Sequence, residues 1–109
     1  MKKLLGFSIF LVFVLIASLT AEAKVTLPAI FSDNMVLQQN TQVNVWGKAA
    51  PGEKVTVKAS WLDKAVTAKA AANGKWTVKL KTPKAITNQS VTVSAENEIT
   101  INNVLIGEV

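Results

Sequence analysis

The sequence predicts an all-β domain, an antiparallel β-sandwich of about seven or eight short strands. Three observations lead to this prediction. Apolar and polar residues alternate with a period of two through much of residues 54–80, as in strands with one buried face. Turn-forming residues recur at intervals of about ten residues. No segment of useful length after residue 23 has the periodicity of a helix. The combination is typical of immunoglobulin-like sandwiches.

The strands can be placed in order along the chain. Pro28 and the turn residues 32–34 limit the N-terminal region to a short edge strand followed by another short strand. Residues 50–53 have the composition of a type II turn, and Asn73-Gly74 predicts a hairpin with a type I′ turn. A change of phase at Asn102-Asn103 predicts a β-bulge. We expect strands at residues 35–38, 42–48, 54–61, 66–72, 75–80, 90–95 and 99–106, with a loop at residues 83–89.

The first 23 residues have the features of a signal peptide. Lys2 and Lys3 form a positively charged start, residues 4–19 are almost wholly apolar, and residues 21–23 fit a small-x-small cleavage site. A membrane anchor is the alternative, but these 16 apolar positions fall short of the roughly 20 that span a bilayer. We expect cleavage after Ala23, no stable membrane anchor afterwards, and export to the periplasm or beyond. Residues 24–109 then form one β-sandwich domain.

The chain is basic, with twelve lysines, no arginine and seven acidic residues. Ten lysines and six acidic residues lie after residue 23, which gives that part a net charge of +4. A nucleic-acid-binding protein would be expected to use clustered arginines. Here Lys54, Lys58, Lys69, Lys75 and Lys79 alternate with apolar residues along the expected strands. The pattern indicates solvated strand faces and protected sheet edges, and it argues against a nucleic-acid partner.

The sequence lacks the residue types that most catalytic sites need. It contains no histidine and no cysteine, which excludes a Ser-His-Asp triad, a cysteine nucleophile and an ordinary zinc site within it. Glu96 and Glu98 flank a turn, where a solvated pair is the simpler interpretation than a general acid and base. No glycine-rich phosphate loop is present. We therefore predict no catalytic residue, no metal and no cofactor in this chain.

The three tryptophans are the candidates for sugar stacking. Trp61 and Trp76 share the phase of apolar residues and are predicted to lie in the core. Trp46 instead lies opposite Val43 and Val45, on the face of its strand that carries Asn44 and Lys48. The preferred interpretation is that another segment or domain covers Trp46. The alternative is an exposed platform that binds a ligand.

Several motifs together resemble one protein family. Residues 27–38 read LPAIFSDNMVLQ, and VWG and PGE follow at residues 45–47 and 51–53. NGKW follows at residues 73–76, and residues 101–109 read INNVLIGEV. These motifs resemble the start of bacterial sialate O-acetylesterase-like proteins of the SGNH-hydrolase class. The resemblance covers most of residues 24–109.

The resemblance implies that a longer parent protein hydrolyses acetyl esters on sialic acids or related sugars. In that family, the segment like residues 104–109 leads into a Gly-Gln-Ser-Asn-Met motif whose serine is the nucleophile, and a histidine lies further on. The present sequence stops at Val109, so no catalytic residue carries over, and we expect a fragment that is inactive alone. Its expected partners are the C-terminal hydrolase domain of the same parent chain and, through it, O-acetylated glycans.

Specific positions carry over from the family's accessory domain. Gly107 and Glu108 match the connection to the hydrolase domain, which makes them candidate interdomain residues. The positions that match the N-terminal motif are Phe31, Asp33, Met35, Leu37 and Gln38. The alternative to this accessory role is a free-standing secreted module that binds glycans or mediates adhesion through Trp46 and the lysine-rich face. A third possibility is a degenerate reading frame without function.

Overall fold

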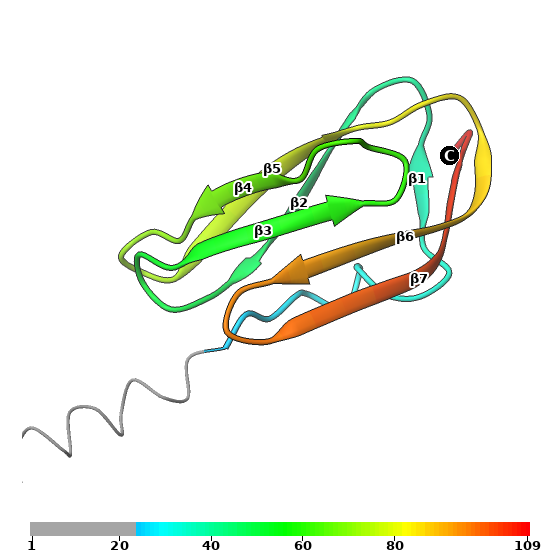
Figure 1. The fold of residues 1–109 in the computed structure, drawn as a ribbon. Helices are drawn as coiled ribbons and strands as arrows, with labels where there is room; N and C mark the ends of the chain where they lie inside the picture. The colour runs from blue at the N-terminus through cyan, green and yellow to red at the C-terminus, as the bar shows by residue number, and fades with distance from the viewer. Residues whose placement is uncertain (1–23) are drawn as a thin grey trace, which may run out of the picture.

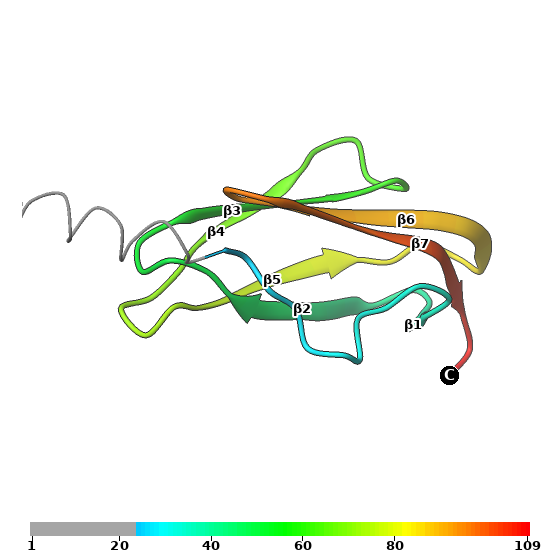
Figure 2. The same ribbon diagram turned by 90° about the horizontal axis from the view of Figure 1, so that it is seen from below.

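The computed structural model describes residues 24–109, which form two packed β-sheets (Figure 1). Figure 2 shows the sheets as two layers. One sheet has the strand order β1-β7-β6-β3-β4, and the other pairs β2 with β5. The strands are β1 (Val36–Gln38), β2 (Gln42–Lys48), β3 (Lys54–Ala59), β4 (Val66–Lys69), β5 (Lys75–Lys81), β6 (Ile86–Ser94) and β7 (Glu98–Gly107). The predicted all-β sandwich is confirmed, whereas the expected signal peptide lies outside the described residues.

The core lies between the two sheets and follows the alternation in the sequence. In β5, Trp76, Val78 and Leu80 are buried while the residues between them are exposed. Val55 and Val57 of β3 meet them from the opposite sheet. Each fully buried aliphatic side chain of this kind contributes about 1.5 to 3 kcal/mol relative to an exposed one. The core therefore depends on the period-two pattern that also predicted the fold.

One strand pair differs from the predicted antiparallel arrangement. β1 and β7 run parallel, with Val36 opposite Leu105, and Leu105 N–H donates to the carbonyl of Met35 at 3.0 Å. A short turn forces neighbouring strands to run antiparallel, but β1 and β7 come from opposite ends of the domain. No turn links them directly, so the alternation pattern contained no information about their relative direction.

The hairpin predicted at Asn73-Gly74 is wrong. The chain does reverse there, but Gly74 N–H donates to the carbonyl of Ala71 at 2.8 Å, so the central residues of the turn are Ala72 and Asn73. Gly74 has a positive φ (83°) and Asn73 does not, whereas a type I′ turn needs both. β4 then pairs with β3, whereas β5 pairs with β2, so the turn connects the two sheets. Gly74 also accepts a hydrogen bond from Ala49 N–H at 2.8 Å. This contact joins the turn to the end of β2 and directs the following residues into the smaller sheet.

Two β-bulges distort the pairing of β6 with β7. Two residue steps in β6, from Gln89 to Val91, oppose three in β7, and Asn103 in this part of β7 has a φ of 53°. The predicted bulge is therefore confirmed. A second bulge lies in β6, where Asn88 has a φ of 60°. The expected loop at residues 83–89 is confirmed for residues 83–85 and wrong for residues 86–89, because β6 begins at Ile86.

Two further local predictions have different outcomes. The type II turn at residues 50–53 is confirmed, since Glu53 N–H donates to Ala50 at 3.0 Å and Gly52 has a φ of 77°. The predicted strand that includes Trp61 ends earlier, at Ala59. Trp61 lies in the following loop, half-buried against the core, and its indole N–H donates to the Lys81 carbonyl at 2.8 Å. Its hydrogen bond explains why this aromatic residue can pack outside a strand.

The N-terminal segment lies along β2. Thr26 N–H donates to the Lys48 carbonyl at 2.8 Å, and Lys48 N–H donates back to Thr26 at 3.1 Å. Val25 is buried in the core, where its N–H donates to Asn97 Oδ1 at 2.9 Å. The expected first edge strand is therefore reduced to a single bridge, which covers one end of the β2 edge.

Gly47 allows this close approach. A Cβ at position 47 would collide with the carbonyl oxygen of Thr26 and would lie 2.9 Å from Cζ2 of Trp76. Trp76 is also the residue opposite Gly47 across the sheet. The indole ring and the N-terminal backbone together occupy the space that a side chain at position 47 would need.

The first testable prediction concerns this contact. Gly47→Ala is expected to destabilise the domain by about 1 to 3 kcal/mol, the usual cost of forcing an additional group into a packed site. Urea denaturation followed by tryptophan fluorescence measures the change. Gly107→Ala is the matched control, because a Cβ there meets no atom within 4 Å, and a change within about 0.5 kcal/mol is expected. Equal stability of the two variants would contradict the packing described at Gly47.

Candidate functional site

Trp46 lies on the outer face of the two-stranded sheet. Val45, its neighbour in β2, points into the core, and strand alternation turns Trp46 outward. Phe31 of the N-terminal segment packs against Trp46 in an edge-to-face arrangement, with ring centroids 4.8 Å apart and an interplanar angle of 81°. Trp46 nevertheless remains 43% exposed. A segment of the chain thus contacts the ring without covering it.

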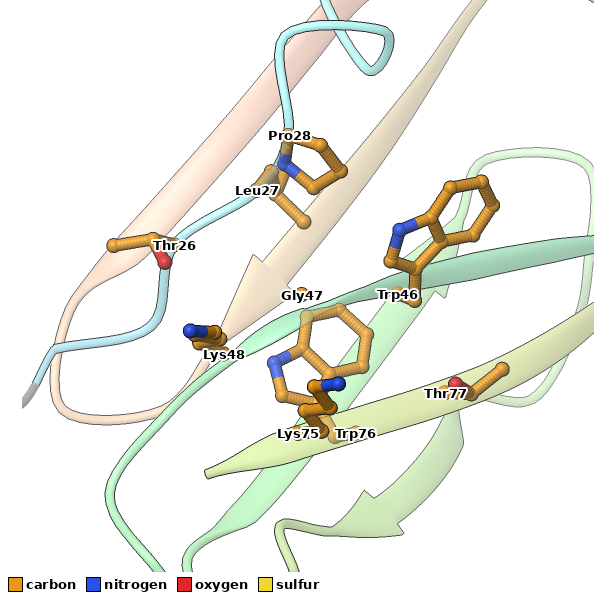
Figure 3. A pocket seen from close by; sticks show the side chains of 9 residues that line it. All are labelled: Thr26, Leu27, Pro28, Trp46, Gly47, Lys48, Lys75, Trp76 and Thr77. Atoms are coloured by element: carbon orange, nitrogen blue, oxygen red, sulfur yellow. The ribbon is translucent and has the colours of Figure 1, made fainter. Parts of the chain in front are cut away.

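Trp46 borders a surface hollow of about 480 Å³. Figure 3 shows the indole rings of Trp46 and Trp76 around it, together with two lysine side chains. The lining combines aromatic and aliphatic surface with hydroxyl and ammonium groups, a combination suited to a ligand with both apolar and polar parts. The lining residues come from the N-terminal segment, β2 and β5: Thr26, Leu27, Pro28, Trp46, Gly47, Lys48, Lys75, Trp76 and Thr77.

Positive charge gathers beside Trp46. Lys48 lies directly opposite Lys75, and Trp46 lies opposite Thr77, so these four exposed side chains occupy neighbouring positions on one face. Neither β2 nor β5 contains an acidic residue. The ammonium groups therefore have no carboxylate partner on these two strands, and the face is electropositive.

Trp76 contributes a polar group near the hollow. The side chain is 3% exposed, and its indole N–H is buried without a hydrogen-bond partner in the part of the chain that the structure describes. Leaving a buried donor without an acceptor costs about 1 to 3 kcal/mol. This donor belongs to a residue that lines the hollow and is not satisfied by the domain itself.

The candidate interdomain residues lie at the opposite end of the sandwich. Glu108 Oε1 accepts hydrogen bonds from Gln39 Nε2 at 2.8 Å and from Gln38 Nε2 at 3.2 Å. Gln38 also accepts a hydrogen bond from Val109 N–H at 3.0 Å, and Gln39 N–H donates to the Gly107 carbonyl at 2.8 Å. The residues after β7 are thus fixed to β1, and the Glu108 carboxylate is engaged within the domain.

Other positions of the N-terminal motif also have structural roles. Asp33 accepts a hydrogen bond from Asn102 N–H at 2.7 Å, and Asn34 N–H donates to the Asn102 carbonyl at 3.0 Å. The Asn103 amide donates to the side chain of Asn34 at 2.7 Å. The motif therefore connects the N-terminal segment to the bulge in β7. Met35 and Leu37 pack against the core.

Two kinds of feature are absent from the residues that the structure describes. Residues 24–109 contain no group of three or more His, Cys, Asp or Glu side chains that could hold a metal ion. Among these residues there is also no helix long and apolar enough to cross a membrane. What the arrangement offers chemically is a surface for binding, composed of an aromatic ring, two ammonium groups and a hydroxyl group.

Comparison with solved structures provides a relative. The chain is similar to a novel carbohydrate acetylesterase from Xanthomonas citri, with a TM-score of 0.71 and 32% sequence identity. The match covers 76% of this chain and 19% of that protein, so the present chain corresponds to a minor part of its length. No protein-family model matches, and no curated protein matches. The similarity is thus to one part of a carbohydrate acetylesterase.

Sequence reasoning identified Trp46 and placed Lys48 on the same face of its strand, but it did not bring Lys75 to that face. The alternation in β5 indicated only that Lys75 lies on a solvated strand face. The proximity of Lys48 and Lys75 depends on the pairing of β2 with β5, strands that are separated in sequence by β3 and β4. One signal in the sequence could have indicated this site. Both strands contain lysines and lack acidic residues, so pairing between them creates an electropositive face.

The second testable prediction concerns the pair of rings. In a double-mutant cycle, Trp46→Ala and Phe31→Ala are expected to show a coupling energy of about 0.5 to 1.5 kcal/mol, as for other edge-to-face pairs. Chemical denaturation of both single variants, the double variant and the unmodified chain gives this value. The cycle contains its own control, because effects unrelated to the contact cancel. Additive effects would show that Phe31 does not pack on Trp46 in solution.

Proposed function

We propose that this chain is the exported N-terminal accessory β-sandwich of a sialate O-acetylesterase-like carbohydrate esterase. The observation that supports the proposal is the 32% identity, over 76% of the chain, to part of a carbohydrate acetylesterase. The parent enzyme would hydrolyse O-acetyl esters on sialic acid or a related sugar. Its serine nucleophile and its histidine would come from a separate hydrolase domain. This sequence contains no histidine, so none of its own serines has the base that activates the nucleophile of a triad.

The contacts of Glu108 support an accessory role. Two glutamine amides bind its carboxylate, and Val109 N–H donates to one of these glutamines. Charge-assisted hydrogen bonds of this kind restrict the direction in which the backbone leaves the sandwich. A hydrolase domain that follows would be oriented relative to the sandwich instead of hanging on a loose linker. Gly107 and Glu108 would then act as interdomain residues by setting this direction.

Chemistry in the parent enzyme would be confined to the hydrolase domain. There a serine would attack the acetyl carbonyl, a histidine would transfer the proton, and hydrogen-bond donors would stabilise the oxyanion. The sandwich would contribute stability and orientation to that domain. It would add no group to the reacting atoms.

The third testable prediction is that the chain alone does not hydrolyse acetyl esters. Release of 4-nitrophenol from 4-nitrophenyl acetate is expected to equal that of a heat-denatured sample, since lysine side chains give only slow background reaction in both. A saturable rate above that control would contradict the proposal, because it would place a nucleophile within the sandwich.

The fourth prediction tests the accessory role in an active enzyme. In the acetylesterase from Xanthomonas citri, the matching segment is replaced by the matching residues of this chain, and acetate release from an acetylated sugar is measured. The chimera is expected to retain activity within about tenfold, which corresponds to about 1.4 kcal/mol in activation free energy. Deletion of the segment is expected to abolish soluble, active enzyme.

A pair of variants makes this test specific. The chimera for this test includes Glu108. Glu108→Ala is expected to lower its melting temperature by about 2 to 4 °C, which corresponds to a loss of about 1 kcal/mol. Glu98→Ala removes an exposed acid from the start of β7, the strand that Glu108 follows, and is expected to change the melting temperature by less than about 1 °C. Full activity of the deletion variant, or a folded chimera without activity, would contradict the accessory role.

A further inference from the structure

The face beside Trp46 has two features that a purely structural surface does not need. First, the indole ring is 43% exposed, although Phe31 is positioned to contact it. The ring borders a hollow, so its open face is available to a ligand that enters the hollow. The flat C–H faces of a sugar ring pack well on an indole, because polarised C–H groups meet the electron-rich aromatic face.

The second feature is unbalanced charge. Lys48 and Lys75 are opposite one another beside the ring, and no acidic residue occurs in either strand. Lys79 and Lys81 continue this charge along the exposed positions of β5. A row of ammonium groups on one face suits a polymer with repeated negative charges better than a single small anion.

We propose that the hollow and the adjoining lysines bind a polyuronate, a polysaccharide whose sugar rings carry carboxylates. One ring would stack on the open part of Trp46, and its carboxylate and that of a neighbouring ring would pair with Lys48 and Lys75. The Thr77 hydroxyl lies opposite Trp46 and would bind a ring hydroxyl. The inference goes beyond the accessory role, since it involves only the surface of this chain and no esterase chemistry.

The test measures binding of the purified full chain to polygalacturonate by isothermal titration calorimetry. Saturable binding that weakens as salt is added is expected. Polygalacturonate with methyl-esterified carboxylates keeps the sugar backbone and loses the charge, so much weaker binding to it is expected. Poly-L-glutamate keeps repeated carboxylates without sugar rings and is also expected to bind weakly.

Three variants locate the site. Trp46→Ala and the double variant Lys48→Gln/Lys75→Gln are each expected to weaken binding about fivefold to tenfold. The double variant Lys54→Gln/Lys58→Gln removes the same charge from exposed positions of β3, in the other sheet, and is expected to change the affinity less than about twofold. Circular dichroism and a thermal melt confirm that each variant is folded.

Several results would overturn the inference. These are the absence of saturable binding, equal binding of the methyl-esterified polymer or of poly-L-glutamate, and equal losses in the two lysine double variants. Unchanged binding of the folded Trp46→Ala variant would also do so. None of these results bears on the chimera experiment, so failure of the polyuronate site and failure of the accessory role can be distinguished.

Discussion

The N-terminal segment can lie against β2 only because position 47 has no side chain. The Thr26 carbonyl occupies the place of the missing Cβ, and the ring of Trp76 lies beside it. From this contact the segment continues in both directions, placing Val25 in the core and Phe31 against Trp46. The same contact covers one end of the β2 edge and supplies one wall of the hollow. Packing at a single glycine thus determines both an edge of the sheet and the shape of the candidate site.

Hydrogen bonds between the two ends of the domain complement this contact. Val25 bonds Asn97, Asp33 bonds Asn102, and Gln38 bonds Val109, across sequence separations of 72, 69 and 71 residues. A domain of this size buries only about 60 to 65% of its unfolded surface, and many small domains add disulfides, which this sequence cannot form because it has no cysteine. Instead of disulfides, the long-range hydrogen bonds hold the first and last segments of the domain together. They also define where the chain leaves the sandwich, which is the property an accessory domain needs.

Local chemistry explains which features could be predicted from sequence. The buried positions of β3 and β5 follow from alternation within each strand, and the type II turn follows from the glycine at position 52. Both features are determined by residues close together in the sequence, so both were predicted correctly. Asn73-Gly74 has the same local pattern as a hairpin, but its contact with Ala49 separates the strands into different sheets. The meeting of Lys48 with Lys75 and the binding of Glu108 by Gln39 depend on long-range pairing. Residue patterns within one strand contain no information about such contacts.

Amide hydrogen exchange at Thr26 and Lys48 tests most directly whether the N-terminal segment is a fixed part of the sandwich. The N–H groups of these two residues form the bridge between the segment and β2. The structure predicts that both amides exchange slowly, within about tenfold of the core amides of Val91 and Val93 in β6. Fast exchange at Thr26 and Lys48, together with slow exchange at Val91 and Val93, would show that the segment is detached in solution. The hollow beside Trp46 would then lack its wall, and the site described for this chain would not exist.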